Sequence, residues 1–459
     1  MNKGDSIVLS ITDLNNLGCG VGRAEDGRVV FVKGAVTGDT VRATVIKVNQ
    51  SYLVARLDEL LTPSPHRAEG SFCSAPLACG GCVYRHVTYE HELTLKRQYV
   101  QNAFKKAGLP HVTVLPVRTT GRVTGYRNKA QYPITKTKNG IRAGFYAPRS
   151  HTIIPADSCA IQNPGFGALV SFFCAFAEEH GWSVYDEETG RGLLRHLYLR
   201  VGEKTGQYLV CPVINGKSLP YGEEFARTLT ERFPAVVGVL VNHNEKNTNV
   251  VLGDTYTTLF GVPYLEDELC GLRFRIAPDS FYQVNRDGAE LLYGLAAEAA
   301  NLDGGEVLMD LYCGTGTIGL SMAKRAQKLC GVEIVESAVR CARENAARNG
   351  IENAEFFCAD AGDREVILRA AGGVRPDMVI IDPPRKGSTH ELVECLASLD
   401  VPRIVYVSCD PDTLARDCAW FAQAGYEIGE VTPVDMFPRT GHVESVVCLK
   451  RRLDVDMRR

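Results

Sequence analysis

Short runs of alternating apolar and polar residues fill the first part of the chain, from about residue 3 to residue 60. Turn-forming pairs such as Asn15-Asn16, Asp26-Gly27 and Gly38-Asp39 separate these runs. A period of two is typical of strands, and short strands between tight turns predict a small antiparallel β-barrel. Such barrels often bind nucleic acid, although a barrel that serves only as a spacer has the same pattern. Pro63-Ser64-Pro65 predicts a linker at its end.

A different pattern begins near Val307, where short apolar runs alternate with amphipathic segments. The apolar runs predict strands at residues 307–311, 328–333, 378–382 and 404–408. Residues 337–349 have helical periodicity, and Gly350 marks the end of that helix. Strands that alternate with helices predict a doubly wound parallel sheet, with a ligand crevice at the carboxyl ends of the strands.

The middle of the chain is less regular. Residues 89–107 predict a helix that ends before Gly108, and we expect it to pack on the catalytic domain. Strand-like runs follow within residues 195–213 and 236–252, including residues 250–252. These elements indicate a mixed α/β region without defining its topology. The predicted division is therefore a barrel at 1–62, a central domain at 63–265 and a catalytic α/β domain at 266–459.

Composition is consistent with several cores, because the chain has 459 residues and is 45% apolar. We find no apolar run near the roughly 18 residues of a bilayer span, and the start has no signal segment. We therefore expect a cytoplasmic protein with no membrane partner, and no obligate protein partner is evident. In a reducing compartment, clusters among the 16 cysteines indicate metal binding or catalysis rather than disulfides.

The formal net charge of −3 hides an uneven distribution. Residues 93–156 contain no Asp or Glu, and they contain the following basic residues: Lys96, Arg97, Lys105, Lys106, Arg118, Arg122, Arg127, Lys129, Lys136, Lys138, Arg142 and Arg149. A stretch with many basic residues, no acidic residues and several tyrosines is typical of a surface that binds a polyanion such as RNA. A solvated basic face without a partner is the alternative. Our candidates for RNA contact are Arg127, Lys129 and Arg142, together with Arg385 further along.

Gly314-x-Gly316-x-x-Gly319 lies between a predicted strand and a predicted helix. In that context it predicts a loop that holds an adenosine-containing cofactor, and Glu333 has the spacing of a carboxylate that binds ribose hydroxyls. This pattern fits either a dinucleotide dehydrogenase or a methyltransferase. Asp382-Pro383-Pro384 adds a rigid turn that presents a carboxylate at a strand end, although a plain turn would have the same sequence.

Cys409 follows the strand predicted at 404–408, in Ser408-Cys409-Asp410-Pro411. A thiolate beside a methyl donor suits the methylation of uracil at carbon 5, because adding the sulfur to carbon 6 makes carbon 5 nucleophilic. A base must then remove the C5 proton, and we assign Glu444, in a polar break before a final strand, to that role. Buried cysteines and surface glutamates are the commoner alternatives.

Taken together, the motifs resemble those of the RNA uracil-5 methyltransferase family. The motifs that carry the resemblance are residues 281–285, 310–320, 332–333, 381–387, 406–411 and 442–444. The resemblance implies that Gln283, Tyr312, Glu333 and Asp382 contact S-adenosylmethionine, that Cys409 is the nucleophile and that Glu444 is the base. We also place Gly314, Gly316 and Asp360 at the cofactor site. Residues 3–60 are similar to the TRAM barrel of many members that act on ribosomal RNA.

A second possible site involves Cys73, Cys79, Cys82 and Cys159. Spacing alone leaves zinc and an iron-sulfur cluster open, since both accept four thiolates. The resemblance implies a [4Fe-4S] cluster, with zinc as the second possibility. Because methyl transfer needs no electron, we expect the cluster to have a structural or RNA-positioning role.

The sequence therefore predicts methyl transfer from S-adenosylmethionine to C5 of a uridine in structured RNA. The TRAM-like barrel favours 23S ribosomal RNA, and a tRNA substrate is the alternative. A nicotinamide-dependent dehydrogenase with the same Gly-rich loop is a rival enzyme class. A non-catalytic RNA-binding assembly factor is a rival of a different kind, and the presence of Cys409, Asp382 and Glu444 together argues against it.

Overall fold

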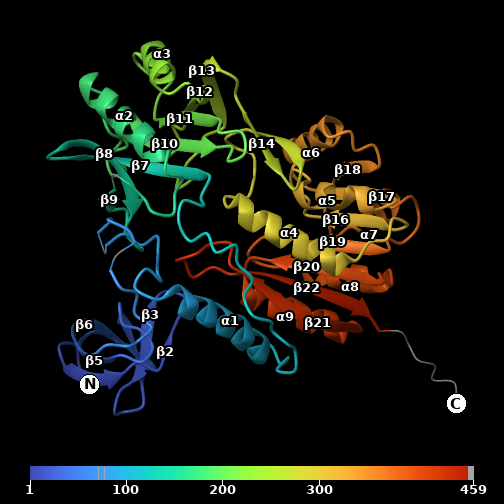
Figure 1. Ribbon diagram of the computed structural model, residues 1–459, viewed down its shortest axis with the longest axis horizontal. Helices are drawn as coiled ribbons and strands as arrows, with labels where there is room; N and C mark the ends of the chain where they lie inside the picture. Colours follow the sequence, from blue (N-terminus) through green and yellow to red (C-terminus); the bar gives the residue numbers. More distant parts are fainter. Residues whose placement is uncertain (71, 77, 157, 453–459) are drawn as a thin grey trace.

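The computed structural model describes residues 1–452 apart from 71, 77 and 157, and it contains three large sheets (Figure 1). The first, here the N-terminal sheet, has the order β1-β5-β6-β4-β3-β2. Its strands are β1 (Ser6–Ser10), β2 (Asp13–Leu14), β3 (Cys19–Arg23), β4 (Val29–Lys33), β5 (Thr40–Val48) and β6 (Tyr52–Thr62). The sequence predicted antiparallel pairing throughout, but β4 pairs with β6 in parallel. The alternating pattern fixes which face is buried and leaves strand direction open.

The predicted linker at 63–65 is not a free connection. Ser64 is buried, its backbone N–H donates to Asp39 Oδ1 at 2.8 Å, and its hydroxyl donates to the Thr37 carbonyl at 2.6 Å. Arg67 then forms an ion pair with Asp39 at 2.6 Å. The chain that leaves the N-terminal sheet is therefore bound back onto it.

The second sheet lies in the central domain and has the order β13-β12-β11-β10-β7-β8-β9. Its strands are β7 (Lys129–Thr137), β8 (Gly140–Tyr146), β9 (Ile153–Pro155), β10 (Leu194–Val201), β11 (Tyr208–Ile214), β12 (Val236–His243) and β13 (Thr255–Gly261), with helices α2 (Phe166–Glu179) and α3 (Gly222–Arg232). The strand predicted at residues 250–252 is wrong. There the Asn244 side chain donates to the carbonyls of Val250 and Val251, which holds the segment as a loop.

The third sheet has the order β18-β17-β16-β19-β20-β22-β21. Its strands are β16 (Val307–Leu311), β17 (Lys328–Glu333), β18 (Ala354–Cys358), β19 (Met378–Ile381), β20 (Arg403–Ser408), β21 (Tyr426–Val434) and β22 (Glu444–Arg451). Its helices are α5 (Thr317–Met322), α6 (Glu336–Arg348), α7 (Arg364–Ala370), α8 (His390–Ser398) and α9 (Pro411–Gln423), with a 3₁₀ turn, η1 (Ala323–Arg325), after α5. The predicted strands and the helix at 337–349 are confirmed to within one residue. The prediction of a parallel sheet is correct for the five strands from β18 to β20, which pair in parallel, and wrong for the edge beyond them, because β22 runs antiparallel to both of its neighbours.

Helix α1 (Tyr89–Lys106) packs on this third sheet, as expected. Val100 and Phe104 share a core with Leu414 and Phe421 of α9. Figure 1 shows α1 beside α9. The segment after α1 then runs beside β21, where the Leu115 N–H donates to the Val431 carbonyl at 2.9 Å. Residues 89–118 are therefore spatially part of the catalytic domain, although they lie far from it in sequence.

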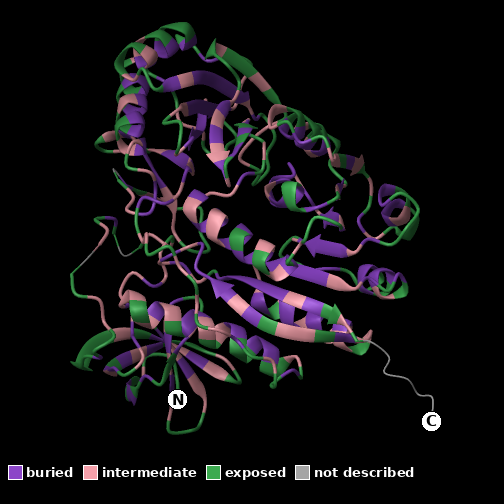
Figure 2. Cartoon of the chain, turned by 45° about the vertical axis from the view of Figure 1, so that its right-hand side comes forward, coloured by how far each residue is buried: buried purple, intermediate pink, exposed green. Residues whose placement is uncertain are grey.

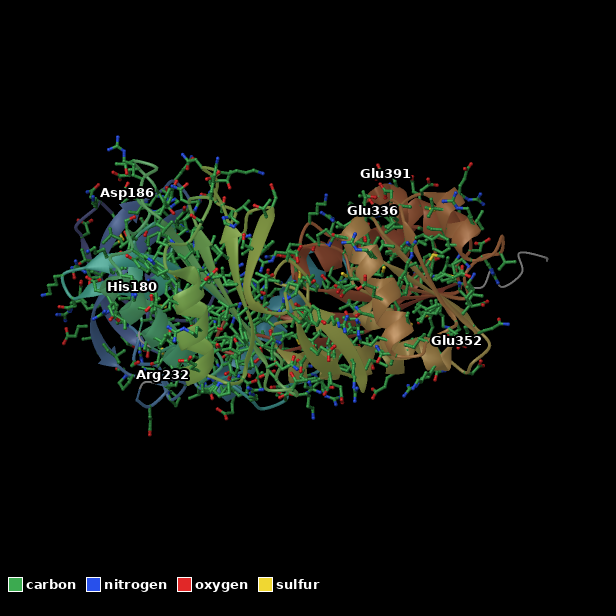
Figure 3. All side chains as sticks on the ribbon, turned by 90° about the horizontal axis from the view of Figure 1, so that it is seen from above. His180, Asp186, Arg232, Glu336, Glu352 and Glu391 are labelled. Carbon is green, nitrogen blue, oxygen red and sulfur yellow. The ribbon has the colours of Figure 1, made fainter. Side chains whose placement is uncertain are left out.

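A hairpin of β14 (Leu265–Leu269) and β15 (Leu272–Ile276), followed by α4 (Arg286–Ala300), joins the two α/β regions. One hydrophobic core contains Leu209 and Leu240 of the second sheet together with Leu292 of α4 and Leu308 of the third. Figure 2 shows the buried strands running through the interior of both regions. Figure 3 shows the two ends from above, with His180 and Arg232 at one end and Glu336 and Glu352 at the other.

Among the described residues, no helix has the length and apolar character needed to cross a membrane.

Candidate active site

The Gly-rich loop leaves the carboxyl end of β16 in left-handed backbone conformations. Tyr312, Gly314 and Gly316 have φ values of 62°, 53° and 80°, and α5 begins directly afterwards. Gly319 packs against Asp310, whose Oδ2 accepts its N–H at 2.9 Å, and a Cβ there would lie 2.7 Å from the same oxygen. Only glycine permits this approach. The other oxygen, Asp310 Oδ1, is buried without a partner among the described residues, and burial raises the Asp310 pKa to about 7.

Glu333 lies beside this loop at the end of β17. Its Oε2 accepts the Gly314 N–H at 3.1 Å, and its Oε1 accepts the Val335 N–H at 2.9 Å. Ile334 next to it is 68% exposed, so an apolar surface remains open beside the carboxylate. Asp360 follows β18, is exposed, and accepts the Gly362 N–H at 2.8 Å. It lies close enough to Tyr312 that burial first, and then the Asp360 charge, raise the pKa of that tyrosine.

Gln283 lies in residues 277–285, which connect β15 to α4 and are here called the Gln283 strap. The central domain holds this segment in place. The Asn128 side chain donates to the Gln283 carbonyl at 2.9 Å, and the fully buried Arg200 donates to the Tyr282 carbonyl at 3.0 Å. The Gln283 side chain hydrogen-bonds the Tyr293 hydroxyl group of α4. Sequence reasoning missed Asn128 and Arg200, since no motif links them to residues more than 80 positions away.

Cys409 and Glu444 come together through the pairing of β20 with β22. Ser408 pairs with Ser445 in the antiparallel register, so the next step of the ladder sets Cys409 opposite Glu444. Residues directly opposite each other on such a ladder have Cβ atoms about 5 Å apart. Asp382 follows Ile381 at the end of β19, which is the neighbour of β20 on its other side. Glu444 was predicted in a polar break, but it is the buried first residue of β22, with 5% exposure.

Cys409, Glu444 and Asp382 are acidic groups that lie close together, and the pKa of each is raised. Burial, followed by the Asp382 charge, raises the pKa of Glu444 to about 8, while Arg385 lowers it. Burial, and then the charges of Glu444 and Asp382, raise the pKa of Cys409 to about 11, and Arg385 again opposes the shift. Asp382 keeps a partial opening to solvent, yet desolvation still raises its pKa to about 7. Arg385, predicted as an RNA contact, is thus an exposed cation beside the nucleophile and the base.

Cys73, Cys79, Cys82 and Cys159 line one cavity of about 280 Å³. Burial and the charges of the other three raise the pKa of Cys82 to about 12, so the four sulfurs are close in space. Within the described ranges, no three His, Cys, Asp or Glu side chains are arranged to hold a single metal ion.

The basic stretch is less free than its sequence indicates. Lys96 is buried between two carboxylates, and Arg122 forms ion pairs with Glu203 at 2.9 Å and Asp287 at 3.2 Å. Arg142 donates to the neighbouring Ile141 carbonyl. Arg127 and Lys129 line the cysteine cavity, where burial lowers the pKa of Lys129 to about 8. Glu92 lies one turn before Lys96 on the same helix, but Asp435, Glu203 and Asp287 come from distant parts of the chain, so the sequence of the stretch alone could not reveal them.

Comparisons with known proteins agree with this architecture. Residues 264–452 match the family model of tRNA (uracil-5-)-methyltransferases, and residues 2–57 match the TRAM domain. A Clostridium acetobutylicum protein named as an uncharacterized RNA methyltransferase is 39% identical over 454 residues, 98% of each chain. One of the same description from Clostridium tetani is 40% identical over 451 residues, which are 98% of this chain and 97% of the other.

Among solved structures, the chain resembles the tRNA (uracil-54, C5)-methyltransferase of Pyrococcus abyssi in complex with S-adenosyl-L-homocysteine. The TM-score is 0.78 at 28% identity, over 96% of this chain and 100% of that one. Fold, site and whole-chain similarity together define an RNA methyltransferase. More narrowly, the chain belongs to the tRNA (uracil-5-)-methyltransferase family and carries an N-terminal TRAM domain. This membership replaces the dehydrogenase hypothesis.

The raised pKa of Glu444 makes stability depend on pH. Below about pH 4.5 the carboxyl group is protonated in the folded and unfolded chains alike, whereas between about 4.5 and 8 only the unfolded chain releases its proton. The free energy of unfolding should therefore fall by about 2 to 4 kcal/mol as the pH rises through this window. Glu444→Gln, which cannot ionise, should show a fall smaller by this amount in urea denaturation measured at pH 5 and pH 8, because only the contributions of Asp310 and Asp382 remain.

The exposed Glu430 on β21 supplies the matched control, since Glu430→Gln should keep the wild-type pH dependence. An equal fall in the wild type and in Glu444→Gln would mean that Glu444 does not titrate in this way.

Proposed function

We propose that the protein transfers a methyl group from S-adenosylmethionine to C5 of a uridine in structured RNA. The observation that carries the proposal is the register that sets Cys409 opposite Glu444, at the strand ends beside the Gly-rich loop. A thiol, a carboxyl group and a cofactor crevice at one sheet edge are what this chemistry requires.

The cofactor crevice suits S-adenosylmethionine. Glu333 presents a carboxylate for ribose hydroxyls, and the exposed Ile334 offers an apolar surface for the adenine ring. Asp310, with its unpartnered Oδ1, and the partly open Asp382 are carboxyl groups near the crevice whose ionised forms a bound sulfonium would stabilise. Gln283 and Tyr312 complete the contacts. When bound, the cofactor supplies an electrophilic methyl group, and the related Pyrococcus abyssi enzyme holds S-adenosyl-L-homocysteine.

In the proposed mechanism, the Cys409 thiol first loses its proton to solvent. The thiolate then forms a bond to C6 of uracil, and the electrons of the C5=C6 bond move toward C5. C5 forms a bond to the methyl carbon as the methyl–sulfur bond breaks, and that electron pair stays on the departing sulfur. The Glu444 carboxylate removes the C5 proton, C5=C6 forms again, and Cys409 leaves as a thiolate.

High pKa values of Cys409 and Glu444 are compatible with these roles if a cation enters the site. Burial and the Asp382 charge raise both pKa values, the Glu444 charge adds to the shift at Cys409, and Arg385 is the cation that opposes both shifts. A sulfonium bound beside Asp382 adds a second positive charge, which favours the thiolate and the carboxylate. Cofactor binding would in this way activate both groups.

RNA carrying 5-fluorouridine at the target should trap the enzyme covalently, because the base cannot remove fluorine as a proton. Cys409→Ala should form no adduct, and Glu444→Gln should accumulate an adduct on ordinary uridine RNA. Denaturing gels with labelled RNA measure both. Cys358→Ala, at an exposed cysteine, is the control that should still form the adduct. Trapping by Cys409→Ala would remove this cysteine from the mechanism, and an absence of adduct in Glu444→Gln would move the base elsewhere.

For the RNA itself we propose 23S ribosomal RNA, as the resemblance of the first 60 residues to TRAM barrels implies. A tRNA is the second candidate, because the Pyrococcus abyssi tRNA enzyme aligns with 96% of this chain. The part of this chain that lies outside the alignment is shorter than the N-terminal sheet, so at least part of that sheet is aligned with the tRNA enzyme. The TRAM domain therefore favours ribosomal RNA without excluding a tRNA. In either RNA the target base must leave its stack, which costs least in a loop.

Unmodified 23S ribosomal RNA and unmodified tRNA, each incubated with the enzyme and labelled S-adenosylmethionine, distinguish these substrates. We expect 5-methyluridine in the 23S RNA, located by mass spectrometry of nuclease fragments. Cys409→Ser is the control for contaminating activity. Labelling of tRNA alone would overturn the ribosomal assignment while leaving the chemistry intact.

We further propose that the four cysteines hold a [4Fe-4S] cluster. All four line one cavity, and four thiolates can hold either a cluster or zinc, so the choice of the cluster rests on the resemblance to the uracil-5 methyltransferases. The Arg85 side chain donates to the Cys73 and Ala75 carbonyls, each at 3.0 Å. The cluster would therefore link the loop that Arg85 stabilises to Cys159. Arg127 and Lys129 line the same cavity, which fits a structural or RNA-positioning role.

Protein purified without oxygen should contain about four iron and four sulfide per chain, as the cluster formula requires. Cys79→Ser should lose both, whereas Cys358→Ser, at an exposed cysteine, should keep them. Iron and sulfide assays with visible absorption measure the content. One zinc and no sulfide would replace the cluster by a zinc site.

A further inference from the structure

Residues 435–443, here the base-carrying loop, join β21 to β22 and lead directly into Glu444. Two side chains from outside the loop fix its backbone. The Asn285 amide donates to the Met436 carbonyl at 2.8 Å, and the Tyr126 hydroxyl donates to the Pro438 carbonyl at 2.8 Å. The position of the proposed base thus depends on a loop that is held from outside.

The strongest attachment comes from α1. Lys96 is 1% exposed, and its ammonium group donates to Asp435 Oδ1 at 2.7 Å, Glu92 Oε1 at 2.8 Å and the Phe437 carbonyl at 3.1 Å. Tyr89 donates to the other Asp435 oxygen at 2.8 Å. One buried cation therefore binds the first and third residues of the loop. A buried charge with several short contacts has a narrowly defined position.

Glu92 also holds the second half of the loop. Its Oε1 accepts the Arg439 N–H at 2.7 Å, and Arg439 donates to the Val87 carbonyl at 2.9 Å. The Arg439 guanidinium lies over the rings of Phe72 and Tyr89, at 5.1 and 5.5 Å. Arg439 has a φ of 71°, so a strained residue is held in place by contacts on several sides.

The N-terminal sheet rests on the same loop. A Cβ at Gly441 would lie 1.9 Å from the Asn16 carbonyl oxygen, which shows how closely the two backbones approach. Tyr84 connects them further, because its N–H donates to the Arg439 carbonyl and its hydroxyl to the Asn15 carbonyl, both at 3.1 Å.

We infer that Lys96 and Glu92 are positioning residues for Glu444, acting through Asp435 and the backbone of the base-carrying loop. This inference rests on the proposed role of Glu444. Both residues lie outside residues 264–452, the segment that matches the methyltransferase family model. The helix α1 thereby supplies a part that the catalytic domain lacks.

Loss of Lys96 should affect one step of the reaction more than the others. Cys409 is placed by β20 and α9, whereas Glu444 directly follows the base-carrying loop. Loosening the loop should therefore slow removal of the C5 proton more than addition of the thiolate. The methylated covalent adduct should then accumulate on ordinary uridine RNA.

Asp435→Asn and Lys96→Met test this with the full-length enzyme. Asp435→Asn keeps the shape of the side chain and removes its charge. In each variant kcat should fall about 10- to 100-fold, the KM for RNA should stay within about twofold, and the adduct should accumulate. The matched controls are Glu90→Gln, at an exposed carboxyl group on α1, and Lys450→Met, at an exposed lysine on β22. Both should behave as wild type.

Thermal melting and binding of S-adenosylhomocysteine identify variants that are folded, and Asp435→Asn decides alone if Lys96→Met does not fold. A folded variant with wild-type kcat, or with reduced kcat and no adduct, would overturn the inference. If wild-type enzyme is not trapped by 5-fluorouridine RNA, the proposed function fails instead. The two failures are therefore distinct.

Discussion

The antiparallel return of β22 between β20 and β21 is the constraint on which the site depends. A parallel strand in that position would begin at the opposite edge of the sheet, far from Cys409. Because β22 runs against β20, its first residue, Glu444, lies at the edge where β16, β19 and β20 end. The same edge carries the Gly-rich loop and Asp382. One change of strand direction thus brings nucleophile, base and cofactor crevice together.

Crowding three acids at one edge has an electrostatic consequence. Burial raises the pKa of all three groups, the Asp382 charge also raises the pKa of Cys409 and Glu444, and Arg385 is the cation that opposes the shifts at those two residues. Such a site favours a positively charged ligand, since a cation stabilises every ionised form at once. The charge of S-adenosylmethionine fits this requirement, and its neutral product does not.

The surroundings of the site come from the whole chain. The central domain holds the Gln283 strap through Asn128 and Arg200, α1 holds the base-carrying loop through Lys96, and the N-terminal sheet packs against Gly441. Shared cores join these parts, so the sequence divisions at 62 and 265 are not divisions of the site. This interdependence agrees with the similarity to the Pyrococcus abyssi enzyme over nearly the full length.

The sequence by itself determined four strands between 307 and 408 and the Gly-rich loop, because these depend on local periodicity and short motifs, but it missed β18. The roles of Cys409 and Glu444 are proposals, and that of Glu444 comes mainly from the resemblance to the uracil-5 methyltransferases. It did not determine the direction of β4 or β22, the loop at 250–252, or the partners of the basic stretch. Lys96 was counted among exposed cations, yet its partner Asp435 lies 339 positions away. Only tertiary folding decides such contacts, because they join segments far apart in sequence and no local pattern in either segment indicates its partner.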